Sequence, residues 1–379
     1  ENLNLEEREY PLRVFFCDVC GLLQTEDFVE KSNMFSAEYA YLSSVSTSWL
    51  DHCKMFAQNI VEKLGLTSDS LVIEAASNDG YLLQFFKQIG IPSLGIEPTN
   101  STAKIARSKG LEVYEDFLCA DSARGIRSIY GKADLIIGNN VLAHVPDIND
   151  FLSSMKYLLK KDGLISLEFP HVLNLVDGLQ FDTIYHEHYS YLSLNVVRYI
   201  SNKVGLFIEN VEEISTHGGS LRVFLRHKLE SDSNYPQTVL DILEKESELG
   251  LTDVSICSRF QQEIENNISD FTDFLSREKK QGSMIVGYGA AAKANTILNL
   301  GKIKNDQISF VYDGAKSKVG RYLPGSKIEI KESTAIFTDK PDVVIIFPWN
   351  IKNEILKFLA PLRENGTRFY TIIPRIERI

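Results

Sequence analysis

The feature that most constrains the fold is an alternation of short apolar runs, small or acidic turns and helix-patterned segments between residues 70 and 170. Short apolar runs that alternate with helical segments are typical of buried parallel strands joined by crossover helices. The pattern therefore predicts an α/β fold with a doubly wound parallel sheet. The expected strands are 70–74, 93–98, 111–117, 134–145 and 164–170.

The turn after the first of these runs, residues 75–80, consists of small and polar residues. Small residues allow a ligand to approach the backbone at the start of a helix. The turn has a single glycine and is not the G-x-G-x-x-G pattern of dinucleotide sites. Because Asp79 would repel a pyrophosphate, the turn favours a cationic or zwitterionic cofactor. Glu97 ends the second run, where an acid about 20 residues after the turn binds ribose hydroxyls.

This arrangement resembles the class I S-adenosylmethionine (SAM) methyltransferases. By that resemblance the first turn lines the cofactor, Glu97 binds the ribose, and Asp116 and Phe117 flank the adenine. Any one acid alone is more commonly a solvated turn carboxylate, but acids at three successive strand ends favour a cofactor site. The expected cofactor-binding residues are Glu74, Ser77, Asn78, Asp79, Gly80, Glu97, Asp116, Phe117 and Asn139.

Residues 185–191 bring together two imidazoles, a carboxylate and three phenols. Alternate histidines could bind a metal only from an extended segment, and the zincin pattern H-E-x-x-H is absent. A structural role for buried His and Tyr is the other alternative. The density of proton-transferring groups favours general acid–base catalysis, because imidazole titrates near neutral pH. His144, at the end of the fourth run, is expected at the same rim of the sheet.

Several motifs in one order extend the resemblance to the whole chain. It is similar to the nucleotide-sugar C-methyltransferases, including the sugar 3-C-methyltransferase of tetronitrose biosynthesis. That family has a zinc-binding N-terminal module, a methyltransferase core and a Rossmann-like C-terminal domain, and it uses thymidine-diphosphate 4-keto-deoxysugars. The motifs are C-x-x-C-G at 17–21, E-Y-x-Y at 38–41, A-S-N-D-G at 76–80, G-I-E-P at 95–98, Y-H-E-H at 185–188, T-H-G-G-S-L-R at 216–222, G-Y-G-A-A-A-K at 287–293 and G-R-Y-L-P-G at 320–325.

The resemblance implies a catalytic set around a 4-keto sugar. His188 would be the general base that removes a proton beside the ketone, and the resulting enolate carbon would attack the sulfonium methyl group. Glu187, Tyr185 and His144 would assist it, and Tyr39 would reach in from the N-terminal module. His186 is an expected substrate contact. Neither the sugar nor the methylated carbon follows from the sequence.

The C-terminal third contains a second strand, glycine turn and helix at 283–294, after a charged segment at 237–280 that predicts one long helix or a pair. Backbone N–H groups and a lysine at such a turn suit an anion. Gly287, Gly289 and Lys293 are therefore expected to bind the substrate diphosphate, although a structural turn is an equal alternative. An NAD-dependent sugar oxidoreductase or epimerase is the competing function, and it lacks G-x-G-x-x-G followed by an acid.

Cys17 and Cys20 form a C-x-x-C-G knuckle near the start of the chain. Two thiolates at this spacing can bind one Zn²⁺, which needs four ligands in a structural site. The favoured interpretation is half of a zinc knuckle whose second cysteine pair lies upstream of Glu1. Two unrelated thiols in a turn are the alternative, and a redox pair is disfavoured because no thioredoxin-like βαβ pattern surrounds the motif.

Three parts are therefore expected: a partial zinc module at 1–60, a SAM-binding core at 61–225 and a Rossmann-like domain at 226–379. The net charge of −11 argues against nucleic acid as a partner, since phosphate backbones need a basic surface. No apolar run approaches the ~18 residues of a membrane span. Five cysteines without a signal peptide predict reduced thiols and a cytoplasmic protein that acts on a small molecule.

Overall fold

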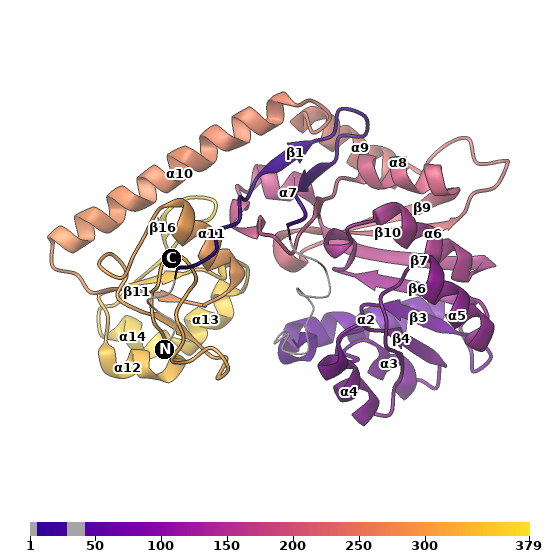
Figure 1. Cartoon of the computed structure of the whole chain (residues 1–379), viewed down its shortest axis with the longest axis horizontal. Helices are drawn as coiled ribbons and strands as arrows, with labels where there is room; N and C mark the ends of the chain where they lie inside the picture. The colour runs from indigo at the N-terminus through magenta and orange to yellow at the C-terminus, as the bar shows by residue number, and fades with distance from the viewer. Residues whose placement is uncertain (1–5, 29–41) are drawn as a thin grey trace. The chain divides into compact units, whose positions relative to one another are not determined.

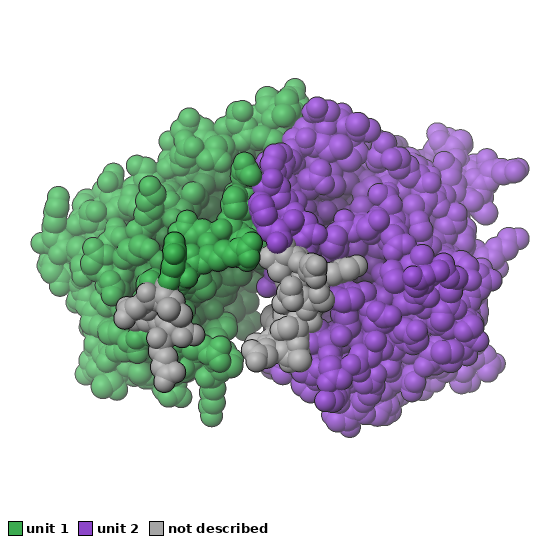
Figure 2. All heavy atoms as spheres, in the orientation of Figure 1, with its two compact units in different colours: residues 1–13, 172–186, 253–379 green, residues 14–171, 187–252 purple. Residues whose placement is uncertain are grey.

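The computed structural model describes residues 6–28 and 42–379 (Figure 1). The chain divides into two compact units, each assembled from separate stretches (Figure 2). Unit 1 comprises 1–13, 172–186 and 253–379, and unit 2 comprises 14–171 and 187–252. The predicted boundary at 225/226 does not coincide with a unit boundary, because helix α9 (Gln237–Leu249) belongs to unit 2.

Unit 2 is built on a seven-stranded sheet with the order β5-β4-β3-β6-β7-β10-β9. The five strands from β5 to β7 are parallel, and β10 is antiparallel to both of its neighbours. This confirms the predicted doubly wound sheet. The strands are β3 (Val72–Ala75), β4 (Ser93–Ile96), β5 (Glu112–Tyr114), β6 (Ala133–Asn139), β7 (Leu159–Pro170), β9 (Leu206–Ile214) and β10 (Ser220–His227).

Successive residues of the central strands enter two different cores, as the period of two in a strand requires. On β6, Ile136 packs with one core, whereas Leu135 and Ile137 pack with the other. Helices cover both faces of the sheet because both faces are apolar. These helices are α2 (Thr47–Leu64), α3 (Leu83–Gln88), α4 (Asn100–Ser108), α5 (Ala120–Tyr130), α6 (Ile148–Leu158), α8 (Leu194–Val204) and α9, with short 3₁₀ turns η1 (Ser43–Val45), η2 (Leu142–His144) and η4 (Thr216–Gly218).

A small antiparallel sheet in unit 2 joins the N-terminal segment to the histidine string (residues 185–191). Its order is β1-β2-β8, from β1 (Val14–Phe16), β2 (Leu23–Thr25) and β8 (Ser190–Tyr191). The cysteine knuckle is the turn between β1 and β2. The knuckle and the residues around position 190 are therefore parts of one folded element.

Unit 1 is built on a six-stranded sheet with the order β13-β12-β11-β14-β15-β16, parallel except for β16. It confirms the predicted second Rossmann-like domain. The strands are β11 (Ile285–Tyr288), β12 (Val311–Asp313), β13 (Ile330–Glu332), β14 (Val343–Ile346), β15 (Arg368–Thr371) and β16 (Glu377–Arg378). The helical segments are α7 (Val172–Asp177), η3 (Phe181–Thr183), α10 (Ser255–Lys280), α11 (Ala292–Leu300), η5 (Ser333–Ala335), α12 (Ile336–Asp339), η6 (Trp349–Ile351), α13 (Lys352–Phe358) and α14 (Ala360–Glu364).

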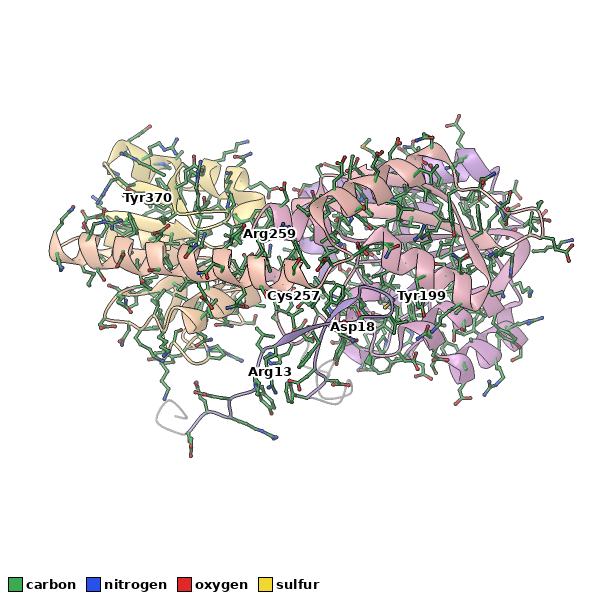
Figure 3. The ribbon with its side chains drawn as sticks, turned by 90° about the horizontal axis from the view of Figure 1, so that it is seen from above. Arg13, Asp18, Tyr199, Cys257, Arg259 and Tyr370 are labelled. Carbon is green, nitrogen blue, oxygen red and sulfur yellow. The ribbon has the colours of Figure 1, made fainter. Side chains whose placement is uncertain are left out.

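The charged segment at 237–280 folds as the predicted pair of helices. α9 ends at Gly250, whose φ of 82° is the left-handed conformation that closes many helices. The second helix, α10, packs on the sheet of unit 1, where the ring centroids of Phe274 and Tyr370 are 4.6 Å apart (Tyr370 is labelled in Figure 3). α9 and α10 therefore belong to different units although they follow each other in the chain.

Candidate functional site

The turn after β3 folds tightly at the carboxyl edge of the sheet in unit 2. Ala76, Asn78 and Gly80 all have positive φ, at 57°, 49° and 76°. Non-glycine residues in this conformation are strained and cluster at functional sites. The neighbouring strand β4 makes room for the turn with Gly95, since a Cβ atom there would lie 2.3 Å from Ser77 Oγ.

Glu74, the third residue of β3, is a fully buried acid. Burial raises its pKa well above the ordinary value, although a hydrogen bond from Tyr81 opposes the shift. Tyr81 is itself 2% exposed and follows directly after Gly80. Burial therefore disfavours the charged form of this carboxyl group at the end of the turn.

Asp79 is 1% exposed, and its charge is balanced within unit 2. The Lys109 ammonium lies 3.3 Å from Asp79 Oδ2 and donates to the Asp79 carbonyl oxygen at 2.7 Å. The Ser44 hydroxyl donates a short hydrogen bond to the same carboxylate oxygen. Ser43 N also donates to Asn78 Oδ1 at 3.0 Å, so the residues before α2 lie against the turn.

Glu97 holds the turn to β4 and α4. Its Oε2 accepts a hydrogen bond from Asn78 N, and its Oε1 accepts from Thr99 N and Thr102 Oγ1, at 2.9 to 3.0 Å. A carboxylate offers about four lone-pair positions, so one remains for a further donor. This is compatible with the predicted bond to a ribose hydroxyl, which stays a prediction.

The remaining predicted cofactor residues lie at successive strand ends of the same sheet. Asp116 is exposed and accepts a hydrogen bond from Phe117 N, while the Phe117 side chain is half-buried. Asn139 is the last residue of β6 and is 6% exposed. The strand ends there, rather than at 145 as expected, because Asn140 takes a φ of 52° and turns the chain away.

These residues fit SAM in unit 2. Asp79 Oδ1 and Ser77 Oγ are buried and have no hydrogen-bond partner among the described residues, so both can bond a ligand. Strand order reverses between β3 and β6, and ligands of open α/β sheets bind at such a crossover. The crossover lies directly beside the turn.

The histidine string meets this edge of the sheet through His188. Its ring packs edge to face on His144, with centroids 4.7 Å apart, and on Tyr191 at 6.2 Å. The backbone holds the pair together, since Tyr189 N donates to Ala143 O and Thr25 Oγ1 donates to His188 O. His188 and His144 are therefore brought together as expected, although the string is a turn and not an extended segment.

His144 and Glu187 are both shifted by their surroundings. Burial lowers the pKa of His144 to about 4, against the effect of a hydrogen bond between its ring and the Glu187 carbonyl oxygen. The imidazole is therefore neutral near pH 7, with one nitrogen donating to that carbonyl and the other able to accept. Burial also raises the pKa of the Glu187 carboxyl.

The predicted catalytic residue Tyr185 and the predicted substrate contact His186 lie in the other unit. Tyr185 and His186 belong to unit 1, whereas Glu187 and His188 belong to unit 2. Within unit 1, His186 Nε2 lies 3.1 Å from Pro11 O, and its ring packs on Tyr10 at 6.1 Å. Tyr39 lies outside the described residues.

A polar network that the sequence did not predict lies at the end of β7. Glu168 is fully buried and contacts both Arg222 of β10 and His52 of α2. Burial by itself would raise the pKa of Glu168, but the hydrogen bond from His52 and the charge of Arg222 outweigh it and hold the pKa low. Arg222 lies in the T-H-G-G-S-L-R motif, which was the available signal; its strand partner could not be identified without the register.

The glycine turn of unit 1 lies close to an acid, contrary to the expectation that none is near. Asp313, the last residue of β12, accepts a hydrogen bond from Ala290 N at 2.7 Å. Parallel pairing of β11 and β12 brings the two strand ends together. Gly289 has a φ of 94°, and a Cβ atom at Gly287 would lie 2.5 Å from the Phe347 ring.

Lys293 lies one turn into α11 and faces polar and aromatic groups of unit 1. Its ammonium is 4.5 Å from the Trp349 ring centroid and 3.2 Å from Asn350 Oδ1. Burial lowers the pKa of Lys293, and the nearby Asp182 carboxyl opposes that shift. Asp182 in turn accepts from Trp349 Nε1 at 2.8 Å. The lysine thus already has a neighbour able to balance its charge.

The cysteine knuckle is a tight turn in which the thiols of Cys17 and Cys20 lie within hydrogen-bonding reach of each other. Gly21, with a φ of 79°, closes the turn, and Gly21 N donates to Cys17 O. Backbone N–H groups of Cys20 and Val19 lower the pKa of Cys17, whereas burial raises that of Cys20. No group of three or more potential ligands occurs within 6–28 and 42–379, so the knuckle offers two thiols where a structural zinc needs four ligands.

A hollow of about 650 Å³ lies elsewhere in unit 2, between the knuckle and α8. None of the predicted cofactor residues lines it. Asp18 and Tyr199, both labelled in Figure 3, are on its wall, with Cys20, Arg198 and Lys203. Across the part of the chain that the structure describes, no helix has the length and apolar character that crossing a bilayer requires.

Comparison with known proteins gives matches along the whole chain. Residues 51–209 match the methyltransferase domain family, residues 215–374 match the "C-methyltransferase C-terminal domain", and residues 1–35 match the "Putative zinc binding domain". The chain is 31% identical to C-methyltransferase NovU of Streptomyces niveus, over 97% of this chain and 87% of that protein.

Solved structures match about half of the chain. One is the magnesium protoporphyrin IX methyltransferase of Synechocystis PCC 6803 with bound SAM, at 18% identity, covering 48% of this chain and 82% of that one with a TM-score of 0.36. Another is the PH0226 protein of Pyrococcus horikoshii OT3, at 13% identity, covering 53% of this chain and 100% of that one with a TM-score of 0.40.

Proposed function

Because the chain belongs to the family of SAM-dependent C-methyltransferases, we propose that its acceptor is a nucleotide-diphospho 4-keto-deoxysugar with thymidine as the nucleoside. The observation that carries the proposal is the imidazole pair of His188 and His144 at the edge of the cofactor-binding sheet. Methyl transfer to carbon needs a carbanion, and a ketone makes the neighbouring C–H acidic enough for an imidazole to remove its proton.

The proposed step begins with His188 as the general base. It takes the proton from the carbon beside the ketone, the C–H electron pair becomes the enolate, and that carbon attacks the methyl group. Bound SAM supplies the methyl on a sulfonium, which leaves as a neutral thioether. A base of this kind contributes typically 10²–10⁴-fold to the rate.

The neighbours of His188 have different roles in this proposal. His144 is neutral, hydrogen-bonds the Glu187 carbonyl oxygen and packs edge to face on His188, so it is proposed to hold the His188 ring in place. The developing enolate oxygen then needs another donor, for which we propose Tyr185. Tyr39 stays a proposed contributor from the N-terminal segment, and His186 a proposed substrate contact.

The cofactor and diphosphate are assigned to different sheets. Glu97, Asp79, Asn139 and the turn after β3 are proposed to hold SAM, with Asp116 and Phe117 beside the adenine. Gly287, Gly289 and Lys293 are proposed to bind the diphosphate through backbone N–H groups and the ammonium. A cytoplasmic location, a zinc ion on Cys17 and Cys20 and the absence of a nucleic-acid partner also stay predictions.

The decisive experiment is incubation with labelled SAM and a panel of nucleotide-diphospho 4-keto sugars. We expect transfer of label to one sugar, with mass and NMR showing a new C–CH₃ bond beside the ketone. Methylation on oxygen or nitrogen, or no transfer to any member of the panel, would contradict the proposal.

Asp313 gives some support to the competing function, an NAD-dependent sugar oxidoreductase or epimerase. An acid at the end of the second strand is where such enzymes bind a ribose. Here, however, Asp313 Oδ2 accepts from Ala290 N and lies 3.5 Å from Lys318, so the carboxylate is engaged by its own unit. Calorimetry with S-adenosylhomocysteine and with NAD separates the two functions.

A further inference from the structure

The buried network at the end of β7 lies on the side of the sheet away from the adenine-binding strands. Glu168 pairs in register with Asn139 of β6 on one side and Arg222 of β10 on the other. The predicted ribose and adenine residues follow β4 and β5, on the opposite side of β3. The β7 end therefore belongs to the half of the crossover that an acceptor would occupy.

The inner part of the network is an ion pair hidden from solvent. Arg222 Nη2 donates to Glu168 Oε2 at 2.7 Å, and the guanidinium also lies over the Phe56 ring at 4.3 Å. Side-chain exposure is 8% for the arginine and 0% for the carboxylate. Because such a pair costs desolvation energy and adds little stability over apolar packing, its presence calls for another reason.

The pair holds two chain segments against the end of β7. Glu168 Oε1 accepts from Thr216 Oγ1 at 2.9 Å, which fixes the turn between β9 and β10. His52 Nε2 lies 2.9 Å from Glu168 Oε2, which fixes α2. Trp49 then packs between the two segments, 5.1 Å from the His52 ring and 5.2 Å from the His217 ring.

The turn that carries His217 is strained. His217 has a φ of 55°, and Gly218 and Gly219 follow with 90° and 111°. A non-glycine residue in this conformation persists only where the surrounding contacts enforce it. Here the enforcing contacts are Thr216 with Glu168 and His171 N with Gly219 O at 3.0 Å. These contacts hold the half-buried His217 imidazole in one place despite the strained backbone.

The charges of this cluster are already balanced, which decides what it can bind. The Arg222 guanidinium faces Glu168 and, at 3.6 Å, the half-exposed Glu212, so no cation of this described cluster is left for a phosphate. Two imidazole rings, those of His52 and His217, lie beside this balanced pair on either side of Trp49. Such groups suit a neutral ligand rich in hydroxyl and carbonyl oxygens.

We propose that Glu168 and Arg222 are positioning residues that hold His52 and His217 as hydrogen-bonding contacts for the sugar ring of the acceptor, and not for its diphosphate. This inference rests on the proposed function, since it assigns one part of the proposed substrate to this cluster. It makes the sugar and the diphosphate separable in binding experiments.

The test uses the full chain and three probes: S-adenosylhomocysteine, thymidine diphosphate and thymidine-diphosphate 4-keto-6-deoxyglucose. In Glu168→Gln and in His217→Asn, the Kd and KM of the keto sugar should rise roughly tenfold or more, as expected for a lost hydrogen bond. The affinities for S-adenosylhomocysteine and thymidine diphosphate should stay at the wild-type value. Asparagine is chosen at 217 because it tolerates the left-handed backbone.

His227→Asn is the matched control, because His227 lies at the far end of the same strand β10 and should leave all three affinities unchanged. Equal weakening of the nucleotide and the keto sugar, or wild-type behaviour of both variants, would overturn the inference. If Glu168→Gln melts below the assay temperature, His217→Asn decides alone. If the wild type neither binds nor methylates any keto sugar of the panel, the proposed function fails and this inference with it.

Discussion

At the scale of single residues, the chemistry depends on which imidazole is able to take a proton. His144 is kept neutral by burial, and its ring packs on His188. A second positive charge beside a protonated base would be unfavourable, so a neutral His144 favours proton uptake by His188. In the proposed mechanism the two rings therefore have distinct roles, although they are the same residue type.

Replacement of His188 tests the base directly. We expect His188→Asn to lower kcat by about 10²–10⁴-fold, because the amide cannot accept the proton. Its affinity for S-adenosylhomocysteine should stay near the wild-type value, as measured by calorimetry. His227→Asn serves as the control for loss of any histidine, and a fully active His188→Asn would move the base to another residue.

The low pKa of His144 predicts a pH-dependent stability. Its folded-state pKa of about 4 lies below the ordinary 6.5, so the unfolded chain takes up the proton first as the pH falls. The contribution is complete above pH 6.5 and is lost as the pH falls from 6.5 to 4, and the loss has reached about 2 kcal/mol at pH 5. Thermal melting of wild type and His144→Gln at pH 7.5 and pH 5 measures it: their difference should shrink at pH 5, and a constant difference would exclude the effect.

Lys293 is the residue that tests the diphosphate assignment. Lys293→Met keeps an apolar side chain against the Trp349 ring and removes the positive charge. We expect thymidine diphosphate to bind roughly 10–100-fold more weakly, the usual effect of one lost charged hydrogen bond. Lys357→Met is the control, because Lys357 is an exposed residue of α13. An unchanged affinity in Lys293→Met would remove the lysine from the site.

At the scale of elements, the cofactor turn depends on how closely β4 approaches it. Gly95→Ala would place a Cβ atom 2.3 Å from Ser77 Oγ and 2.9 Å from Ser77 Cβ. Overpacking of this kind costs about 1–3 kcal/mol and should displace the turn, so we expect weaker binding of S-adenosylhomocysteine by roughly tenfold. Gly314→Ala, where nothing lies within 4 Å of the added atom, is the control. Equal affinities in the two variants would show that the turn does not need the space.

The sequence predicted those elements that depend on the local pattern of apolar and polar residues. The apolar runs that became β3 and β4, and the acids Glu74 and Glu97 at their ends, follow from residue periodicity and from the parallel sheet. The network of Glu168, Arg222 and His52 did not follow. Glu168 and Arg222 are 54 positions apart and meet only through the register of an antiparallel pair, which periodicity does not specify.

The end of β6 is a second feature that the sequence pattern did not predict. The run 134–145 is apolar enough to predict one strand, yet the strand stops at Asn139. The backbone of Asn140 turns left-handed there, a choice that asparagine tolerates but does not require. That early stop allows Leu142–His144 to form a 3₁₀ turn, and the turn carries His144 to its position against His188.

At the scale of the whole molecule, the chain passes repeatedly between its two compact units. Residues 172–186 belong to unit 1, although the residues on both sides belong to unit 2. Phe181 of this insert is 2% exposed in the core of unit 1, and Thr296 Oγ1 donates to Ile184 O at 2.8 Å. Unit 1 therefore does not consist of the C-terminal residues alone.

Removal of the buried ring should destabilise unit 1. We expect Phe181→Ala to cost about 3–5 kcal/mol, the usual effect of deleting a buried aromatic side chain. Calorimetry should show a lower unfolding temperature, and residues 253–379 expressed without the insert should melt lower still. Phe358→Ala is the control, because Phe358 of the same unit is 42% exposed. A melting curve identical to wild type would mean that the insert is dispensable.

Each compact unit contains one of the two tryptophans in the chain, Trp49 in unit 2 and Trp349 in unit 1. Trp49 packs on the rings proposed for the sugar, and Trp349 lies beside the lysine proposed for the diphosphate. Replacing either indole by phenylalanine leaves a single intrinsic fluorophore. Emission from the two variants would then report, without any attached dye, which half of the protein melts or meets its ligand first.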